Sequence, residues 1–358
     1  MRIVLVINSL HTGGAERVFS EDANRLAERG HKVAVCLLYG SLANDQFAKL
    51  LSPAVRGVEL HARSPFDIEA LRKFRRFVRE FQPDACLSTL NDANIFARMG
   101  SVEIRGVRYL RREANELSMK PWWHRVMDLL LDWRTDGVIA VSEEIRRSIT
   151  WTNPWTKGRV AVLPNAVSLR PEVARRAEDP LTILCIGSLT HKKDHGTLIS
   201  ACGILKRRDL PFSLVLVGDG AERDQLEELA WREGVAGEVT FTGRISHDAV
   251  EHWYAKASVF ALPSRVEGSP NVLLEAMAAG LPSVASDIPS VREVIGREVG
   301  ILVAPGDADG FADALSRFSA EPALRATMGS RARRLIAERF DPIRRLENLE
   351  ALLYGKAH

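Results

Sequence analysis

The sequence predicts an α/β protein with two Rossmann-like parallel sheets in tandem, and three observations carry this prediction. The chain has 358 residues, more than one hydrophobic core usually serves, so two domains of ordinary size are expected. Short apolar runs alternate with longer amphipathic segments, which is typical of parallel strands covered by helices. The same alternation starts again in the second half of the chain.

Apolar runs give the expected strands of each half. In the first half they lie at 2–8, 31–39, 84–89, 107–112, 137–142 and 159–165. In the second half they lie at 181–189, 213–220, 238–243, 259–264, 282–286 and 300–304. The polar, proline-containing segment 168–180 separates the two sets, so we expect an N-terminal domain over 1–170 and a C-terminal domain over 175–340. Ligands collect at strand carboxyl ends and between such domains, where the site is expected.

The composition excludes several classes of function. The 49 basic and 46 acidic residues are too balanced for general nucleic-acid binding, so no nucleic-acid partner is expected. The four cysteines lie far apart, the histidines are single, and the D-x-D pair at 307–309 is interpreted as a helix cap. We therefore expect no metal and no cofactor. The first apolar run is interpreted as a strand rather than a signal peptide, and no run is long enough to span a membrane, which favours a cytoplasmic protein.

Two strand-to-helix turns are candidate anion sites. Gly13 and Gly14 follow the first strand, where a missing Cβ and the free amides of a helix start favour an anion. The matching turn of the second half carries Lys192 and Lys193, which would neutralise a phosphate. A purely structural turn and a solvated lysine pair are the alternatives. The first turn lacks the spacing of a dinucleotide fingerprint or a P-loop.

The stretch SRVEGSPNVLLEAMAAGLPSV, residues 264–284, holds two unexpected carboxylates. Ser269 is the expected N-cap and Pro270 the first residue of an apolar helix that contains Glu275, while Glu267 precedes the cap. A buried carboxylate needs a partner, so Glu275 accepts hydrogen bonds from backbone or an Arg, or else from ligand hydroxyls. One carboxylate on each side of a helix-start anion site suits a nucleotide sugar.

These residues resemble the retaining GT-B-fold glycosyltransferases of family 4, or glycosyltransferase group 1. Glu267 and Glu275 match the E-x7-E motif of that family, in the wider form E-G-x-P-N-x-x-x-E-A-M-A-x-G-x-P. Similar stretches run along most of the chain: GGAER at 13–17, LPNAV at 163–167, KKDH at 192–195, VGDG at 217–220 and FTGR at 241–244.

The resemblance implies a donor site for a nucleotide-diphosphate sugar, with a UDP-sugar favoured. Glu275 would bind the ribose, Glu267 the transferred sugar, and Lys193 the leaving diphosphate. Ser188 stands where the family usually has Arg, so Arg17 or Arg244 substitutes or catalysis is slower. The remaining donor-side residues are Gly13, Gly14, Gly268, Ser269, Pro270 and Asn271. The family implies retention by front-face attack without a metal, and a last helix, 341–358, packed on the first domain.

The acceptor is expected on the N-terminal domain. RREANELS, residues 111–118, resembles a stretch of bacterial enzymes that extend lipid-linked oligosaccharides, which makes Glu113 and Asn115 the acceptor-side candidates. We expect a glycan or polyprenyl-diphosphate-linked acceptor of cell-surface polysaccharide assembly. The basic segment 70–82 and the tryptophan-containing segment 119–133 would lie on an anionic membrane at its inner face, or pack as ordinary helices.

Two other functions compete with glycosyl transfer. A hydrolysing nucleotide-sugar epimerase shares the two-domain architecture, but the E-x7-E stretch favours a transferase. A non-catalytic nucleotide-sugar-binding subunit of a transferase complex is the alternative that Ser188 motivates.

Overall fold

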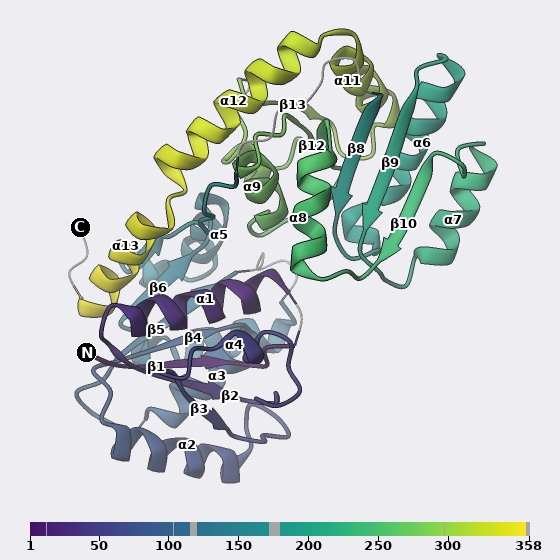
Figure 1. Cartoon of the computed structure of the whole chain (residues 1–358). Coiled ribbons are helices and arrows are strands. Elements are labelled where there is room, and N and C mark those ends of the chain that lie inside the picture. Colours follow the sequence, from purple (N-terminus) through teal and green to yellow (C-terminus); the bar gives the residue numbers. More distant parts are fainter. Residues whose placement is uncertain (12, 103, 115–119, 172–179, 297, 356–358) are drawn as a thin grey trace. The chain divides into compact units, whose positions relative to one another are not determined.

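The computed structural model describes the chain except residues 12, 103, 115–119, 172–179, 297 and 356–358, and it divides into two compact units (Figure 1). Unit 1 comprises Met1–Asn165 and Ile343–His358, and unit 2 comprises Ala166–Pro342. The segment 168–180, expected to separate the domains, therefore begins within unit 2, and its central residues 172–179 lie outside the described part.

The seven strands of unit 1 form one parallel sheet in the order β3-β2-β1-β4-β5-β6-β7. The order reverses between β1 and β4, which places a topological switch point beside the carboxyl end of β1. Strand β3 is absent from the sequence prediction because its four residues, RGVE, are half-exposed and show no apolar run. The strands are β1 (Arg2–Ile7), β2 (Lys32–Leu37), β3 (Arg56–Glu59), β4 (Ala85–Thr89), β5 (Arg108–Glu113), β6 (Gly137–Ala140) and β7 (Val160–Val162).

Helices cover both faces of this sheet, because alternate side chains of each strand point to opposite faces. One face, with Leu5 and Ile139, packs against α1 (Gly14–Glu28) and α13 (Pro342–Tyr354). The other face, with Val4 and Cys86, packs against α2 (Ile68–Phe81) and α3 (Asn91–Gly100). Val138 and Ala140, neighbours of Ile139, pack against α5 (Glu143–Thr152) on that second face. Other elements among the described residues of unit 1 are α4 (Trp122–Leu130), η1 (Ala48–Leu50), η3 (Asp132–Arg134) and η4 (Pro154–Thr156).

Helix α13 belongs to unit 1 although it follows unit 2 in the chain. Leu346, Leu349 and Leu353 enter the core beside α1. Arg345 forms a buried ion pair with Asp22 of α1, and Arg112 of β5 contacts the same carboxylate at 2.6 Å. Burial alone would raise the pKa of Asp22, but the two guanidinium groups outweigh it and hold that pKa below its usual value.

Unit 2 repeats the architecture with a six-stranded parallel sheet in the order β10-β9-β8-β11-β12-β13. Its strands are β8 (Leu181–Ile186), β9 (Phe212–Val217), β10 (Val239–Gly243), β11 (Val259–Leu262), β12 (Ser283–Ser286) and β13 (Gly300–Val303). Its helical elements are η5 (His191–Lys193), α6 (His195–Arg207), α7 (Arg223–Arg232), α8 (His247–Lys256), α9 (Asn271–Ala278), α10 (Pro289–Arg292), α11 (Ala308–Ala320) and α12 (Pro322–Arg339). The second parallel sheet of the sequence prediction is thus confirmed.

Two further findings concern the cysteines and the helix lengths. All four cysteines are buried and none forms a disulfide. Across the part of the chain that the structure describes, no helix is both long and apolar enough to cross a bilayer.

The packing of α13 yields a first prediction. Leu349 is 0% exposed, so Leu349→Ala should lower the free energy of unfolding of unit 1 by about 2–5 kcal/mol, through lost burial and a residual cavity. Ile343→Ala, on the same helix but 66% exposed, is the matched control and should change little. Urea unfolding followed by circular dichroism measures both. A loss for Leu349→Ala as small as that for Ile343→Ala would contradict the packing of Leu349 in the core of unit 1.

Candidate functional site

Lys193 and Glu267 meet at the edge where two neighbouring strands of unit 2 end. Strands β8 and β11 pair in parallel, so η5, after β8, lies beside the loop that follows β11. The Nζ atom of Lys193 lies 2.5 Å from Oε1 of Glu267. Ser264, fully buried, donates its hydroxyl to the same oxygen at 2.7 Å. Two donors on one oxygen fix the position of the carboxylate, and the lysine neutralises its charge.

Further contacts hold the two loops together. The backbone N–H of Arg265 donates to the carbonyl of Lys192 at 2.8 Å, and its guanidinium pairs with Asp194 at 2.9 Å. The neighbouring VGDG turn approaches equally closely, because a Cβ on Gly218 would lie 1.9 Å from the carbonyl oxygen of Gly187. Only glycine fits this position, which also has φ +138. The turns after β8, β9 and β11 are therefore packed backbone to backbone.

Glu275 is buried in α9 and has partners within unit 2. The hydroxyl of Tyr254 donates to its Oε2 at 3.0 Å, and Arg170 lies 3.4 Å from the same atom. Burial and the nearby Glu275 raise the pKa of Tyr254, so its hydroxyl stays protonated and donates. Arg170 also donates to Glu251 at 2.6 Å and lies over the Tyr254 ring, 4.5 Å from its centroid. These contacts satisfy the alternative in which an Arg compensates Glu275, and the sequence identified neither Arg170 nor Tyr254.

The start of α9 differs from the sequence prediction. The helix begins at Asn271, Pro270 occupies the cap position, and Ser269 makes no side-chain capping bond. The reason is a tight turn, in which the N–H of Asn271 donates to the carbonyl of Ser269 at 2.9 Å. The prediction of Ser269 as N-cap was wrong by one residue.

The other donor-side candidates are divided between the two units. In unit 2, Ser188 and Arg244 are exposed, and the hydroxyl of Ser188 lies 3.5 Å from that of Thr190. In unit 1, Gly13 precedes α1 with φ 146, and Arg17 pairs with Glu21 at 3.0 Å. Gly14 is the first residue of α1, and Gly268 lies in the loop that follows Glu267.

Comparison with known proteins identifies the family. The profile "Glycosyl transferases group 1" matches residues 169–335, and "Glycosyl transferase 4-like domain" matches residues 13–166. The chain belongs to the group 1 glycosyltransferases. The alpha-D-kanosaminyltransferase of Streptomyces kanamyceticus is 34% identical over 67% of this chain and 66% of that protein. The lipopolysaccharide core biosynthesis glycosyltransferase LpsE of Rhizobium meliloti is 28% identical over 92% of both chains.

The solved structures agree on the fold of this glycosyltransferase. Anabaena HepE in complex with UDP-glucose superposes with a TM-score of 0.84 at 19% identity, over 99% of this chain and 100% of that one. The predicted GT-B fold, with two parallel-sheet Rossmann-like units, is confirmed.

The acceptor-side candidates of the glycosyltransferase lie in unit 1. Glu113, the last residue of β5, is buried and pairs with Arg111 and, at 2.7 Å, with Lys120. Lys120 also contacts Asp128, at 2.8 Å, so Glu113 is part of a buried charge network rather than a surface group. Asn115 lies outside the described residues.

A polar cluster that the sequence did not predict lies at the carboxyl edge of the same sheet. Tyr39, just beyond β2, donates its hydroxyl to Asp92 at 2.8 Å, and Nε2 of His124 contacts the other oxygen of Asp92 at 2.8 Å. Asp92 lies in the first turn of α3, after β4. These residues are widely separated and form no spaced motif, so no signal in the sequence would have found them.

Metal ligands are not gathered in the described ranges. Within them, no group of three His, Cys, Asp or Glu residues is arranged to hold an ion.

His195 makes the stability of the folded protein depend on pH. This first residue of α6 is almost fully buried, and burial, with a smaller contribution from Lys193, lowers its pKa from 6.5 to about 4. As the pH falls between these values, the unfolded chain binds a proton that folded His195 resists, so stability is lost. Unfolding at about pH 7 and about pH 5 should show a loss roughly 2 kcal/mol larger in the wild type than in His195→Gln. Equal losses would refute the neutral buried histidine.

Proposed function

We propose that this glycosyltransferase moves a hexosyl group from a nucleotide-diphosphate sugar, with a UDP-sugar favoured, to a glycan or polyprenyl-diphosphate-linked acceptor. The reaction would retain the anomeric configuration and serve cell-surface polysaccharide assembly. The observation that carries the proposal is the 2.5 Å contact between Lys193 and Glu267, the first carboxylate of the E-x7-E motif of the family. The similarity to LpsE, a lipopolysaccharide core biosynthesis glycosyltransferase, supports the pathway, and the similarity to HepE, whose structure contains UDP-glucose, supports the donor.

The chemistry follows from the charges at this edge of unit 2. As the bond between the anomeric carbon and the diphosphate breaks, negative charge grows on the leaving phosphate, and a cation there stabilises the transition state. Lys193 would supply that cation, so the diphosphate competes with Glu267 for its ammonium group. Glu267, still held by Ser264, would then accept hydrogen bonds from the sugar. The acceptor oxygen bonds to the anomeric carbon on the face from which the diphosphate leaves. The proton of the acceptor hydroxyl passes to the departing phosphate.

The proposal also assigns residues to the ribose, the diphosphate and the acceptor. Glu275, held by Tyr254 and Arg170, would bind the ribose hydroxyls. The loop from Gly268 to Asn271, with Ser188, Arg244, Gly13 and Gly14, would line the diphosphate and sugar. On unit 1, the acceptor would meet the edge that carries Tyr39 and Asp92, above the network of Glu113.

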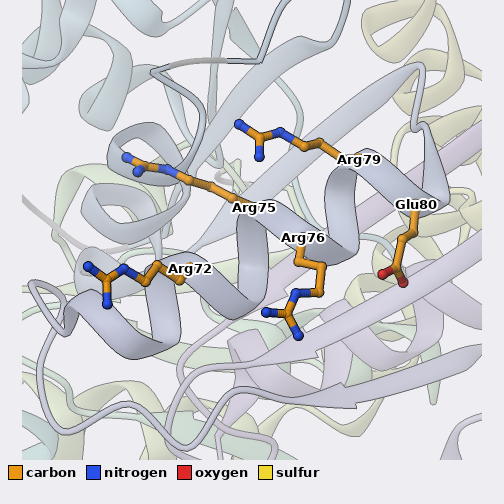
Figure 2. Close-up of a pocket in the computed structure, with 5 residues that line it drawn as sticks. All are labelled: Arg72, Arg75, Arg76, Arg79 and Glu80. Carbon is orange, nitrogen blue, oxygen red and sulfur yellow. The ribbon is translucent and has the colours of Figure 1, made fainter.

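A cytoplasmic enzyme held peripherally on the inner face of the cell membrane fits a lipid-linked acceptor. The expected contact segments are 70–82 and 119–133. Figure 2 shows Arg72, Arg75, Arg76 and Arg79 projecting from α2, around a surface hollow that Glu80 also lines. The apolar side of α2 is buried against the sheet, so these arginines are the part of the helix that an anionic surface would meet.

The catalytic lysine is tested against its neighbour. Lys193→Ala should lower kcat by roughly 100- to 1000-fold, because one charged stabiliser of the leaving group is lost. Lys192→Ala, one residue away and exposed, should lower kcat far less, because it is the ammonium group of Lys193 that lies at Glu267. Mass spectrometry with a panel of UDP- and GDP-sugars and a short polyprenyl-diphosphate acceptor measures transfer. Epimerised sugar would instead indicate the hydrolysing epimerase, and donor binding without turnover would indicate the non-catalytic subunit motivated by Ser188.

Nucleotide binding is tested without any acceptor. A nucleoside diphosphate that binds only the folded state should raise the unfolding free energy of unit 2 by about 2.7 kcal/mol at 100 times its Kd. We expect UDP to raise the Tm more than GDP, and Glu275→Gln to reduce the shift. If neither nucleotide changes the Tm, the nucleotide-sugar proposal fails.

A further inference from the structure

Four tryptophan side chains of unit 1 are largely exposed to solvent. Trp151 and Trp155 are 84% and 77% exposed, and Trp122 and Trp133 are 75% and 66% exposed. They lie on α4, η3, α5 and η4, and the exposed Leu129 and Leu130 lie beside Trp133 in sequence. Large apolar side chains gathered on a surface usually mark an interaction site.

Contacts within unit 1 make these elements neighbours of one another. A small cavity is lined by Asp128 and Leu129 of α4 together with Ile149 and Thr152 of α5, so the two helices are neighbours. Arg159 connects η3 with η4, because its Nη2 atom lies 2.5 Å from Asp132 and donates to the carbonyl of Trp155 at 3.0 Å. The tryptophans at 133 and 155 therefore project from elements tied to one guanidinium. We call the surface formed by Trp122, Trp133, Trp151 and Trp155 the tryptophan surface.

The tryptophan surface shares a layer with the arginines of α2. Helix α3 packs against both α2 and α4, and Arg75 of α2 donates to the carbonyl of Gly100 at the end of α3, at 3.2 Å. Phe66, just before α2, contacts Trp123 of α4 with ring centroids 5.9 Å apart. The core contacts of α2 and α5 place them on the same face of the sheet. One side of unit 1 thus combines exposed indoles with a row of guanidinium groups.

We propose that the tryptophan surface docks on a bilayer that contains anionic phospholipid, with Trp151 and Trp155 as insertion points beyond the expected segments 70–82 and 119–133. Indole rings are amphipathic and favour the boundary between headgroups and acyl chains. The guanidinium groups of α2 are complementary to lipid phosphates in the same layer. This combination favours a bilayer over a second copy of the chain, whose matching surface would bring the same cations together.

This inference rests on the proposed function in one respect, because a lipid-linked acceptor would give membrane docking its role. Lipid binding itself requires no turnover. The nucleotide binding proposed above is measured separately, through the Tm, so failure of one proposal leaves the other open to its own test.

The full-length chain is tested by co-sedimentation with vesicles of phosphatidylcholine and phosphatidylglycerol. The double variant Trp151→Ala/Trp155→Ala should lower the partition coefficient by about tenfold or more, because two interfacial aromatics are lost. Trp231→Ala is the matched control, since Trp231 is 75% exposed on α7 of unit 2, and it should bind like the wild type. Unchanged Tm values of both variants would establish that each is folded.

Two further measurements separate the possible occupants. Arg72→Gln/Arg76→Gln should weaken binding to vesicles with phosphatidylglycerol and reduce its salt dependence, as expected for phosphate contacts. Light scattering reports self-association. Vesicle binding that survives the double tryptophan substitution would overturn the proposal, and so would a dimer that this substitution dissociates while lipid binding is unchanged.

Discussion

The pairing of Lys193 with Glu267 is the constraint on which the candidate site depends. A carboxylate at this depth is costly unless a cation and a hydrogen-bond donor accompany it, and Ser264 provides the donor. The contact exists because β8 and β11 are adjacent parallel strands, which brings loops distant in sequence to one edge. The doubly wound topology therefore both builds the core of unit 2 and assembles its charges.

The same compensation recurs at other buried carboxylates of the protein. Glu275 has Arg170 and Tyr254, Asp22 has Arg112 and Arg345, and Asp128 has Arg98 and Lys120. Around Asp128, burial opposes ionisation, but the surrounding cations hold its pKa below the usual value. These groups fix α9, α13 and α4 by directional contacts, which apolar packing alone does not supply.

Most of the fold was predictable because strands buried on both faces appear as continuous apolar runs, and β3 was missed because it has none. Lys193 and Glu267 were candidates because each lies in a motif with recognisable spacing, but their direct contact was not predicted. Ser264, Arg170 and Tyr254 were not candidates, since hydrogen-bond partners from separate elements leave no spacing in the sequence. The cap at Ser269 was misplaced because a local turn, invisible in residue identity, shifts the start of α9. Exposure of Trp151 likewise depends on how α5 packs.

The position of α13 has a consequence for how the chain is made. Unit 2 interrupts unit 1, since the core around Leu349 is completed only by residues that follow Pro342. During synthesis, unit 2 has all its residues outside the ribosome before unit 1 does. Until α13 has emerged, unit 1 lacks Arg345 beside Asp22 and the leucines that α13 adds to the core beside α1.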